Sequence, residues 1–426
     1  MKKFLIAILI LFLNFNFASA EENLDFETAR TDLICALSSM SAYSDETNVF
    51  LRSMLTSRGW KISALTTKNS RANVKAYLFE RNSDSDNKIK ILVIAGTEEM
   101  KDVEVDFRVG RVGLQSDEIG EDKIFVHRGF RDYTDAALSG GVKEFLLEDL
   151  KNNPEETLYI TGHSLGGAVA LMTAVRLCDS GANMNQIKVV TFGAPALGNR
   201  NFVEAYKDKI DLKRFSVSGD FIKKSLQVLG YVHFGNLIEY KPLKSDNYHS
   251  HSMALYLESA LKNYYNAGGF EKFVDFDDKN KIDTKIYVAP INILQKSFSA
   301  EEEKYILPIL NDGLKSRLTN LIFAEPRFIE VKKAEQFSYD ITKFLEPARK
   351  QGCKFILVQN LQNKSVREAE QREMRIILDE MIFDMNGTLL SMQTAGSTTK
   401  NLTVIEAALF AQESLRETRE NFFAAK

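Results

Sequence analysis

The chain is organised around residues 158–178, which read LYITGHSLGGAVALMTAVRLC. Four β-favouring residues run into a glycine-rich turn, and a helical pattern rich in small residues follows directly. Strand and helix can pass this close to the serine only because positions 162 and 166 are glycines, which have no side chain. The pattern therefore predicts that Ser164 projects from the carboxyl end of a sheet. A helix begins there, and the amide of Leu165 can receive the charge of an oxyanion.

The G-x-S-x-G pentapeptide alone is weak evidence for a catalytic serine. Ordinary glycine and serine usage places this pattern by chance in about one chain in ten of this length. A glycine-rich turn without chemistry is the alternative interpretation. A serine hydroxyl is a poor nucleophile at neutral pH, so it needs a base. The base in turn needs an acid that fixes its tautomer and stabilises its positive charge. In α/β-hydrolases the chain order is serine, acid, histidine.

Asp220 is the preferred acid, because it lies shortly after a predicted strand at residues 212–217. The carboxyl ends of parallel strands share one edge of a sheet, and chemistry is expected at that edge. Asp208 and Asp211, on a helix-to-strand connection, are weaker candidates. An aspartate after glycine also commonly forms an Asx turn, which is the structural alternative for Asp220.

His251 is favoured as the base, because it follows the acid and lies at the start of the last helix of this region. His249, two residues earlier, is its rival, and His233 is a third candidate. His163 lies inside the elbow, and its side chain is predicted to point away from the serine. The fifth histidine, His127, precedes the acid.

A predicted strand at residues 89–95 ends in Gly96 and Thr97. In the functional interpretation the backbone amide of Thr97 joins that of Leu165 to form an oxyanion hole. Loss of one such donor typically costs about 2.7 to 4 kcal/mol of transition-state stabilisation. The alternative is a threonine that simply caps the strand end.

Strands and helices alternate along the first part of the chain. Predicted strands cover residues 74–80, 89–95, 124–130, 158–161, 187–192 and 212–217, and predicted helices cover 26–60, 133–150, 200–207 and 252–265. This order predicts an α/β fold with a mostly parallel sheet and helices on both faces.

Six motifs in sequence resemble the class 3 lipases, which are the fungal triacylglycerol lipases and their plant and bacterial relatives, over about residues 26–266. The motifs are IAGT at 94–97, like the family's R-G-T; VHRGF at 126–130, like V-H-x-G-F; the elbow at 160–167, like T-G-H-S-L-G-G-A; TFGAPALGN at 191–199, like T-F-G-A-P-x-x-G-N; YVHFG at 231–235; and His251 with Tyr256. The resemblance implies an α/β-hydrolase fold and a serine ester hydrolase of the lipase or phospholipase type. It also favours His251 as the base and gives His233 a structural place.

Two positions depart from the family pattern. Ala95 stands where the family usually has arginine. The family usually carries D-x-V-P after the acid strand, whereas Asp220 is followed by FIKK at residues 221–224. The wall of the acyl pocket near the acid is therefore expected to differ from that of the family.

The residues after Thr97 bear on the substrate. A lipase usually hides its site under a lid with one strongly apolar face, but residues 98–123 are rich in charge, which favours a solvated loop. We expect hydrolysis of carboxylic esters in acyl lipids, with peripheral contact to a lipid surface. The alternative hypothesis is an envelope-binding protein whose hydrolase fold is catalytically idle.

The charge balance and the cysteines exclude other classes of function. The 55 basic and 58 acidic residues give a net charge of −3, which does not suggest nucleic acid as the main partner. Cys35, Cys178 and Cys353 are too few and too widely spaced for a disulfide framework or a thiol metal site, and no H-E-x-x-H pair is present. We expect no metal and no other cofactor.

The first 20 residues have the pattern of a secretory signal peptide. Lys2 and Lys3 form a cationic start, residues 4–17 are mostly apolar, and residues 18–20 form an A-x-A cleavage site. The apolar run is shorter than the ~20 residues that span a bilayer. Cleavage after Ala20 and a secreted or periplasmic location are therefore predicted.

Three further segments are predicted: a hydrolase domain at residues 21–269, a charged linker at 270–285 and a smaller α/β domain at 286–426. In the last segment, strands are predicted at 286–290, 327–331, 353–358, 374–384 and 388–392, and helices at about 299–318, 334–350 and 402–422. Ser299 with Glu302 predicts a capping box, and the Asn-Gly pair at 386–387 predicts a hairpin. The segment resembles the small α/β domains of bacterial envelope lipoproteins, which implies a binding module that docks an envelope partner.

Overall fold

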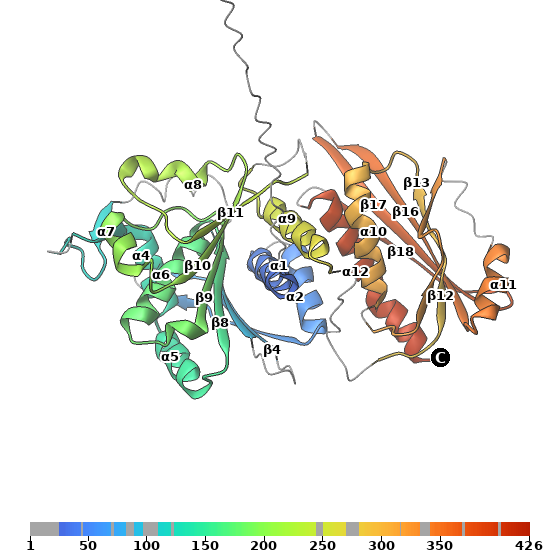
Figure 1. The fold of residues 1–426 in the computed structure, drawn as a ribbon, viewed down its shortest axis with the longest axis horizontal. Helices are drawn as coiled ribbons and strands as arrows, with labels where there is room; N and C mark the ends of the chain where they lie inside the picture. The colour runs from blue at the N-terminus through green and yellow to red at the C-terminus, as the bar shows by residue number, and fades with distance from the viewer. Residues whose placement is uncertain are drawn as a thin grey trace, which may run out of the picture.

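The computed structural model describes residues 25–43, 46–69, 72–81, 89–96, 110–120, 123–243, 250–269, 281–315, 317–332, 341–368, 371–398 and 402–426. The predicted signal peptide, most of the charged stretch after Gly96 and the greater part of the predicted linker lie outside these residues. Thr97 and His249 lie outside them as well. The described residues form two α/β units side by side, and helices fill the space between their sheets (Figure 1).

The first unit is built on a sheet with the strand order β1-β4-β5-β8-β9-β10-β11. These strands are β1 Trp60–Ala64, β4 Ala76–Arg81, β5 Ile89–Ile94, β8 Thr157–His163, β9 Ile187–Phe192, β10 Asp211–Val217 and β11 Asn236–Tyr240. The five strands from β5 to β11 run parallel, and β1 and β4 are antiparallel additions. The predicted α/β-hydrolase fold, with its mostly parallel sheet, is confirmed.

Helices cover both faces of this sheet, as predicted (Figure 1). They are α1 Phe26–Ser41, α2 Glu46–Ser57, α4 Arg128–Ala137, α5 Val142–Asn152, α6 Leu165–Asp179, α7 Arg200–Tyr206, the single turn α8 Ile222–Ser225 and α9 Met253–Asn266, with the short 3₁₀ turns η1 Met184–Gln186 and η2 Gln227–Leu229. One hydrophobic cluster joins α4, α5 and α6 to one face, and another joins α1, α2 and α9 to the other. Central strands are apolar on both faces because both faces are covered.

Three predictions of element boundaries in this unit were wrong. The helix expected at 26–60 is two helices, and its last residue, Trp60, begins β1. The helix expected at 133–150 is divided into α4 and α5 by Gly140 and Gly141, which have φ values of 65° and 88° and so break a right-handed helix. The strand expected at 124–130 is only β7 Phe125–His127, and it pairs with β6 Arg111–Gly113 in a separate two-stranded sheet.

The second unit has a sheet in which β16 is central. The strands are β12 Ile286–Val288, β13 Ile291–Leu294, β14 Leu321–Phe323, β15 Phe328–Val331, β16 Phe355–Glu368, β17 Gln371–Asp384 and β18 Leu389–Thr398, and the helices are α10 Ala300–Lys315, α11 Thr342–Lys350 and α12 Val404–Ala424. On one side β16 pairs in parallel with β12 and β13, and on the other it pairs antiparallel with β17, which continues to β18.

In the second unit, the predicted helix cap and turn agree with the structure better than the predicted strand lengths do. Glu302 N donates to Ser299 Oγ at 3.2 Å and Ser299 N donates to Glu302 Oε2 at 2.7 Å, which is the predicted capping box. The predicted turn at Gly387, with a φ of 85°, joins β17 to β18. The long antiparallel pairing with β17 extends β16 well beyond the predicted strand at 353–358, whereas β17 begins three residues before the predicted strand at 374–384. Ile282, in the predicted linker, is buried and bridges to Leu318, so it packs with the second unit.

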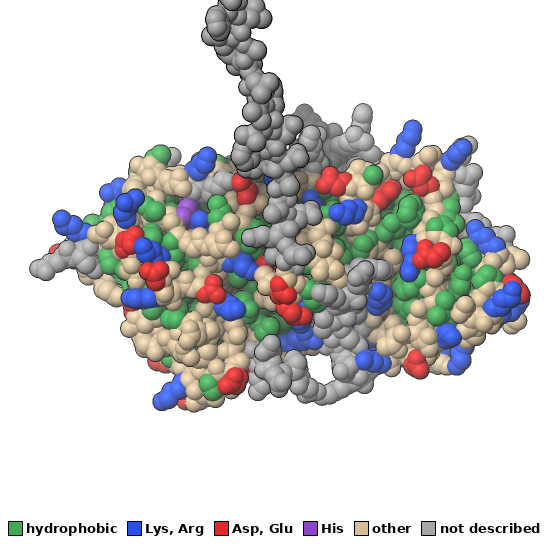
Figure 2. Space-filling view, in the orientation of Figure 1, with side chains coloured by type: hydrophobic (Ala, Val, Ile, Leu, Met, Phe, Trp, Pro, Cys, Tyr) green, Lys and Arg blue, Asp and Glu red, His purple; other side chains and the backbone are tan. Residues whose placement is uncertain are grey.

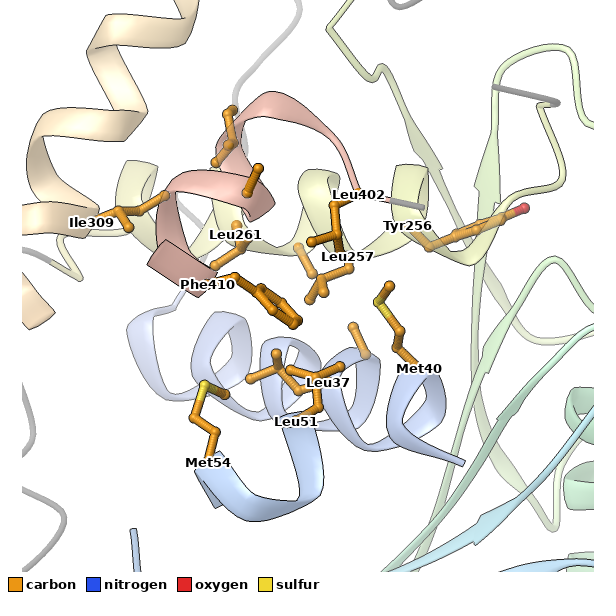
Figure 3. Close-up of a cluster of buried hydrophobic side chains, with 14 of the residues drawn as sticks. Leu37, Met40, Leu51, Met54, Tyr256, Leu257, Leu261, Ile309, Leu402 and Phe410 are labelled. Atoms are coloured by element: carbon orange, nitrogen blue, oxygen red, sulfur yellow. The ribbon is translucent and has the colours of Figure 1, made fainter. Parts of the chain in front are cut away.

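The two units share one hydrophobic cluster. It combines side chains from α1, α2 and α9 with side chains from α10, α12 and the second sheet, as Figure 3 shows for Leu37, Leu257 and Phe410. A buried ion pair crosses the same interface: Arg58 Nη1 donates to Glu413 Oε2 at 2.8 Å, and Nη2 donates to Oε1. Burial alone would raise the pKa of Glu413, but the charge and hydrogen bond of Arg58, together with the charges of Arg416 and Arg419, outweigh it and lower the pKa.

None of the helices in the described ranges has the length and apolar character needed to cross a bilayer.

Substituting Glu413→Gln should lower the free energy of unfolding by about 3 kcal/mol, because Arg58 would keep a largely buried charge without its partner. Urea unfolding followed by the fluorescence of Trp60 and by far-ultraviolet circular dichroism measures this. Both probes should give one midpoint, since the units share a core. The matched control is Glu346→Gln on α11, whose exposed pair with Lys350 should contribute less than about 1 kcal/mol. Equal losses in the two variants would contradict the prediction.

Candidate active site

The elbow forms where β8 passes into α6. Ser164 lies between them with a φ of 57° and a ψ of −126°, a backbone conformation that is strained for a residue with a side chain. A Cβ on Gly162 would lie 2.5 Å from the carbonyl carbon of Gly166. A Cβ on Gly166 would lie 2.2 Å from the carbonyl oxygen of Ile94. Strand β5, strand β8 and helix α6 therefore meet so closely that both positions exclude any side chain.

Three of the predicted site residues lie in one hydrogen-bonded row. The Nε2 atom of His251 lies 2.8 Å from Ser164 Oγ, and its Nδ1 atom lies 2.8 Å from Asp220 Oδ2. All three side chains are buried. An ionised carboxylate only accepts hydrogen bonds, so the ring proton resides on Nδ1 and Nε2 is free to accept the serine proton. This is the arrangement that allows a serine to act as a nucleophile.

Asp220 is fixed through both of its carboxylate oxygens. Oδ1 accepts a hydrogen bond from the backbone N–H of Ile222 at 2.8 Å, so the residue also forms the Asx turn of the alternative interpretation. Oδ2 accepts from the hydroxyl of Tyr256 at 2.6 Å as well as from His251. Burial, followed by the charge of Asp220, raises the pKa of Tyr256 well above its usual value. The tyrosine therefore stays protonated and donates.

Gly193 completes this corner of the site. Its φ is 57°, and a Cβ there would lie 2.9 Å from Asp220 Oδ2 and 3.1 Å from His251 Cε1. The position follows β9 and brings its backbone directly beneath the acid and the base. Any side chain at Gly193 would displace one of them.

The His163 side chain contacts the main chain of His251 and the hydroxyl of Tyr43. Its Nε2 lies 2.9 Å from the carbonyl oxygen of His251, and its Nδ1 lies 2.6 Å from the hydroxyl of Tyr43. A carbonyl only accepts, so Nε2 carries the proton, and Nδ1 of the neutral ring accepts from Tyr43. Burial, followed by the proximity of His251, lowers the pKa of His163 well below its usual value. Sequence reasoning gave no indication of Tyr43, which follows α1 and lies 120 residues from His163.

The oxyanion side of the site is described in part. Leu165 is the first residue of α6, so its amide lies at the positive end of the helix dipole, directly after the serine. On the opposite side, Gly96 is the last described residue after β5. A Cβ at Gly96 would lie 2.6 Å from the carbonyl oxygen of His163. The backbone that leads into Thr97 therefore packs against the elbow.

The competing candidates lie elsewhere. Asp208 and Asp211 are exposed, and Asp211 begins β10, at the opposite end of that strand from Asp220. His233 lines a small cavity beside α6 with Gly167 and Phe202. His127 is buried between the rings of Phe130 and Tyr231.

Among the residues that the structure describes, there is no group of three or more His, Cys, Asp or Glu side chains that could hold a metal ion. Cys35 and Cys353 are buried, Cys178 is half-buried, and none of the three forms a disulfide.

The stretch of chain that contains the elbow is similar to known proteins. Residues 91–228 match the family model described as Lipase (class 3). The toxin TseL of Vibrio cholerae is 40% identical over 84 residues, which are 20% of this chain and 12% of that protein. Phospholipase A1-II 1 of Oryza sativa subsp. indica is 29% identical over 141 residues, which are 31% of this chain and 36% of that protein. The chain thus spans little more than a third, or less, of the length of these relatives.

A solved triacylglycerol lipase, described as having a serine protease triad as its catalytic centre, is 22% identical. The match covers 51% of this chain and 81% of that one, with a TM-score of 0.41.

Replacing Tyr43 by Phe should slow covalent labelling of Ser164 by a fluorophosphonate about tenfold, because His163 would lose the hydrogen bond that holds its ring in place and the support of His251 would weaken. The rate of labelling, measured by intact mass, reports how strongly the serine is activated. His163→Gln keeps a neutral donor and should label faster than His163→Ala. Equal labelling of Tyr43→Phe and the unmodified chain would show that this pair does not support the base.

Proposed function

We propose that the protein is a serine carboxylic-ester hydrolase acting on acyl lipids, a proposal supported by the match of residues 91–228 to the class 3 lipase model. The observation that carries the proposal is the row from Ser164 through His251 to Asp220, with both hydrogen bonds at 2.8 Å. An idle hydrolase fold would not need to keep a strained serine, a histidine and a buried carboxylate hydrogen-bonded in one row.

The proposed reaction forms an acyl-enzyme on Ser164 and then hydrolyses it. His251 Nε2 takes the hydroxyl proton of Ser164 while Oγ attacks the ester carbonyl carbon, and Asp220 stabilises the imidazolium that forms. The backbone amides of Leu165 and Thr97 are proposed to bind the oxyanion. His251 then protonates the departing alcohol, which leaves an acyl group on Ser164. Water, activated by the same histidine, releases the acid and restores the serine.

The substrate class is proposed from the family and from the site's surroundings. The family is one of lipases, and the relative from Oryza sativa is a phospholipase by name. The segment after Asp220 carries exposed apolar side chains, among them Phe221, beside the catalytic base. We therefore place phospholipid or acylglycerol esters ahead of small soluble esters as the substrates.

Purified Ser164→Ala should lose hydrolysis of p-nitrophenyl esters by about 10⁴-fold or more while keeping its fold, because the nucleophile is removed. The matched control is Ser180→Ala, at the other end of the same helix α6, which should keep full activity. Esters of increasing chain length, compared with phospholipids, test the substrate class. Undiminished activity in Ser164→Ala would refute the hydrolase, and a sharp preference for short soluble esters would refute the acyl-lipid assignment.

Two statements on cellular context are also proposals. We propose that the chain is secreted or periplasmic after removal of residues 1–20, on the basis of its cationic start, apolar run and A-x-A site. We further propose that the second unit docks an envelope partner. Because α10 and α12 pack against the first unit, such a partner would bind the opposite side, where α11 lies (Figure 1).

The exported protein should begin at Glu21, which intact mass spectrometry of the extracellular or periplasmic fraction measures directly. Replacing Ala18 and Ala20 by bulky residues should leave the chain uncut, because small residues at these positions are needed for cleavage. A full-length chain in the exported fraction would contradict the prediction.

A further inference from the structure

A cavity lies between the two units. Its walls come from helices α1, α2, α9, α10 and α12 and from strand β1. The centre of a water molecule can occupy about 90 Å³ of it. Because one water needs about 10–15 Å³ on this measure, the cavity has room for about six to nine waters. Helices α1, α2 and α9 cover the face of the first sheet opposite to α6, which Ser164 precedes, so the cavity is separate from the catalytic site.

Most of the side chains in the wall are apolar. Figure 3 labels four of them, Leu37, Met54, Leu261 and Ile309, which come from α1, α2, α9 and α10. A water molecule against such a wall finds few hydrogen-bond partners, whereas a hydrocarbon chain gains from leaving bulk water. The lining therefore favours a ligand with an apolar body.

Two buried donors in the same wall have no hydrogen-bond partner among the described residues. They are Nε1 of Trp60, a residue that is 2% exposed, and Nε of Arg30. A buried donor without an acceptor is unfavourable, so each such group in a folded protein calls for an explanation. A ligand that brings an oxygen acceptor into the cavity would supply one.

The charged side chains in the wall favour an anion. The charge of Arg58 is already matched by Glu413, to which it donates at 2.8 Å. Arg30 donates from Nη1 to Glu27 Oε2 at 2.7 Å, but the Glu27 side chain is 62% exposed, so water weakens this pair. Burial raises the pKa of Asp312 to about 7, which leaves that carboxyl only partly charged at neutral pH. The positive charge of Arg30 is therefore available to a ligand.

The preference for an anion comes from the cavity and not from the surface around it. On the face shown in Figure 2, Lys and Arg side chains are interspersed with Asp and Glu side chains over both units. The formal net charge of the chain is −3. A mixed and slightly negative surface does not concentrate anions by long-range attraction. Selection of an anion therefore depends on the donors inside the cavity.

We propose that this cavity binds a carboxylic acid with an unbranched apolar chain of medium length. The carboxylate accepts hydrogen bonds from Arg30, and the chain lies along the apolar wall beside Trp60. This inference goes beyond the proposed function, because it assigns a second site that does not include Ser164. The bound acid contacts helices of both units and so strengthens their association.

The test uses Trp60, which is the single tryptophan of the chain, so its fluorescence reports on this cavity. The probe is a decanoate that carries bromine on its chain, because bromine quenches tryptophan fluorescence on contact. Added to the full chain with Ser164→Ala, it should quench Trp60 to a saturating level, and decanoate without bromine should reverse the quenching. Quenching that is absent, or that rises without saturation, would overturn the proposal.

Two substitutions test the two parts of the ligand. Arg30→Gln should weaken binding about tenfold, because it removes a charged donor, and Arg30→Lys should restore part of the loss. Leu409→Phe places a larger side chain into the cavity from α12 and should weaken binding about tenfold or more. The matched control is Leu307→Phe on α10, at a half-buried position outside the cavity wall, which should bind the probe normally. Circular dichroism verifies that each variant is folded.

The remaining outcomes separate the explanations. Equal binding by Leu409→Phe and Leu307→Phe would refute the cavity as the site. Normal binding by Arg30→Gln, or decanol that competes as well as decanoate, would refute recognition of a carboxylate. Hydrolysis of a soluble p-nitrophenyl ester by the chain with Ser164 intact tests the proposed function separately. Hydrolysis without saturable quenching would refute the cavity site alone, and saturable quenching without hydrolysis would refute the hydrolase alone.

Discussion

The close passage of β5, β8 and α6 is the constraint on which the site depends. A Cβ on Gly166 would come within 2.2 Å of the carbonyl oxygen of Ile94, so these elements meet backbone to backbone. Ser164 takes up the sharp change in direction at a φ of 57°, a conformation that costs about 1 to 3 kcal/mol. Its N–H donates to the carbonyl of Phe192 at 2.9 Å, and the small buried side chains of α6 let the helix lie flat on the sheet. The packing of α6 thus offsets the strain at the serine.

Helix α9 connects the site to the second unit. It begins directly after His251, and its Tyr256 donates to Asp220. Leu257 and Leu261 of the same helix belong to the cluster that includes Phe410 of α12 (Figure 3). One helix therefore holds the acid on one side and the second unit on the other. Removing the second unit would expose the face of α9 that is now buried, so the two units are best regarded as one cooperative structure.

The sequence was sufficient for features that depend on local spacing. The elbow at Ser164 and the turn at Gly387 each depend on residue types within a short window. Features that depend on contacts between distant parts of the chain could not be predicted from the sequence. Tyr43 reaches His163 only because α1 packs on the sheet, and β6 is too short and polar to be recognised without its partner β7. The lengths of β16 and β17 are likewise set by their mutual pairing.

The charge of the buried site depends on which of its side chains are protonated. Four titratable side chains meet there, and the raised pKa of Tyr256 and the lowered pKa of His163 keep two of them neutral. In the proposed reaction, Asp220 supplies the counter-charge for an imidazolium on His251. A second cation on His163, whose ring centroid is 4.6 Å from that of His251, would oppose that imidazolium by about 3 to 4 kcal/mol at the dielectric of a protein surface. Burial of His163, which lowers its pKa, therefore helps to keep the positive charge on His251.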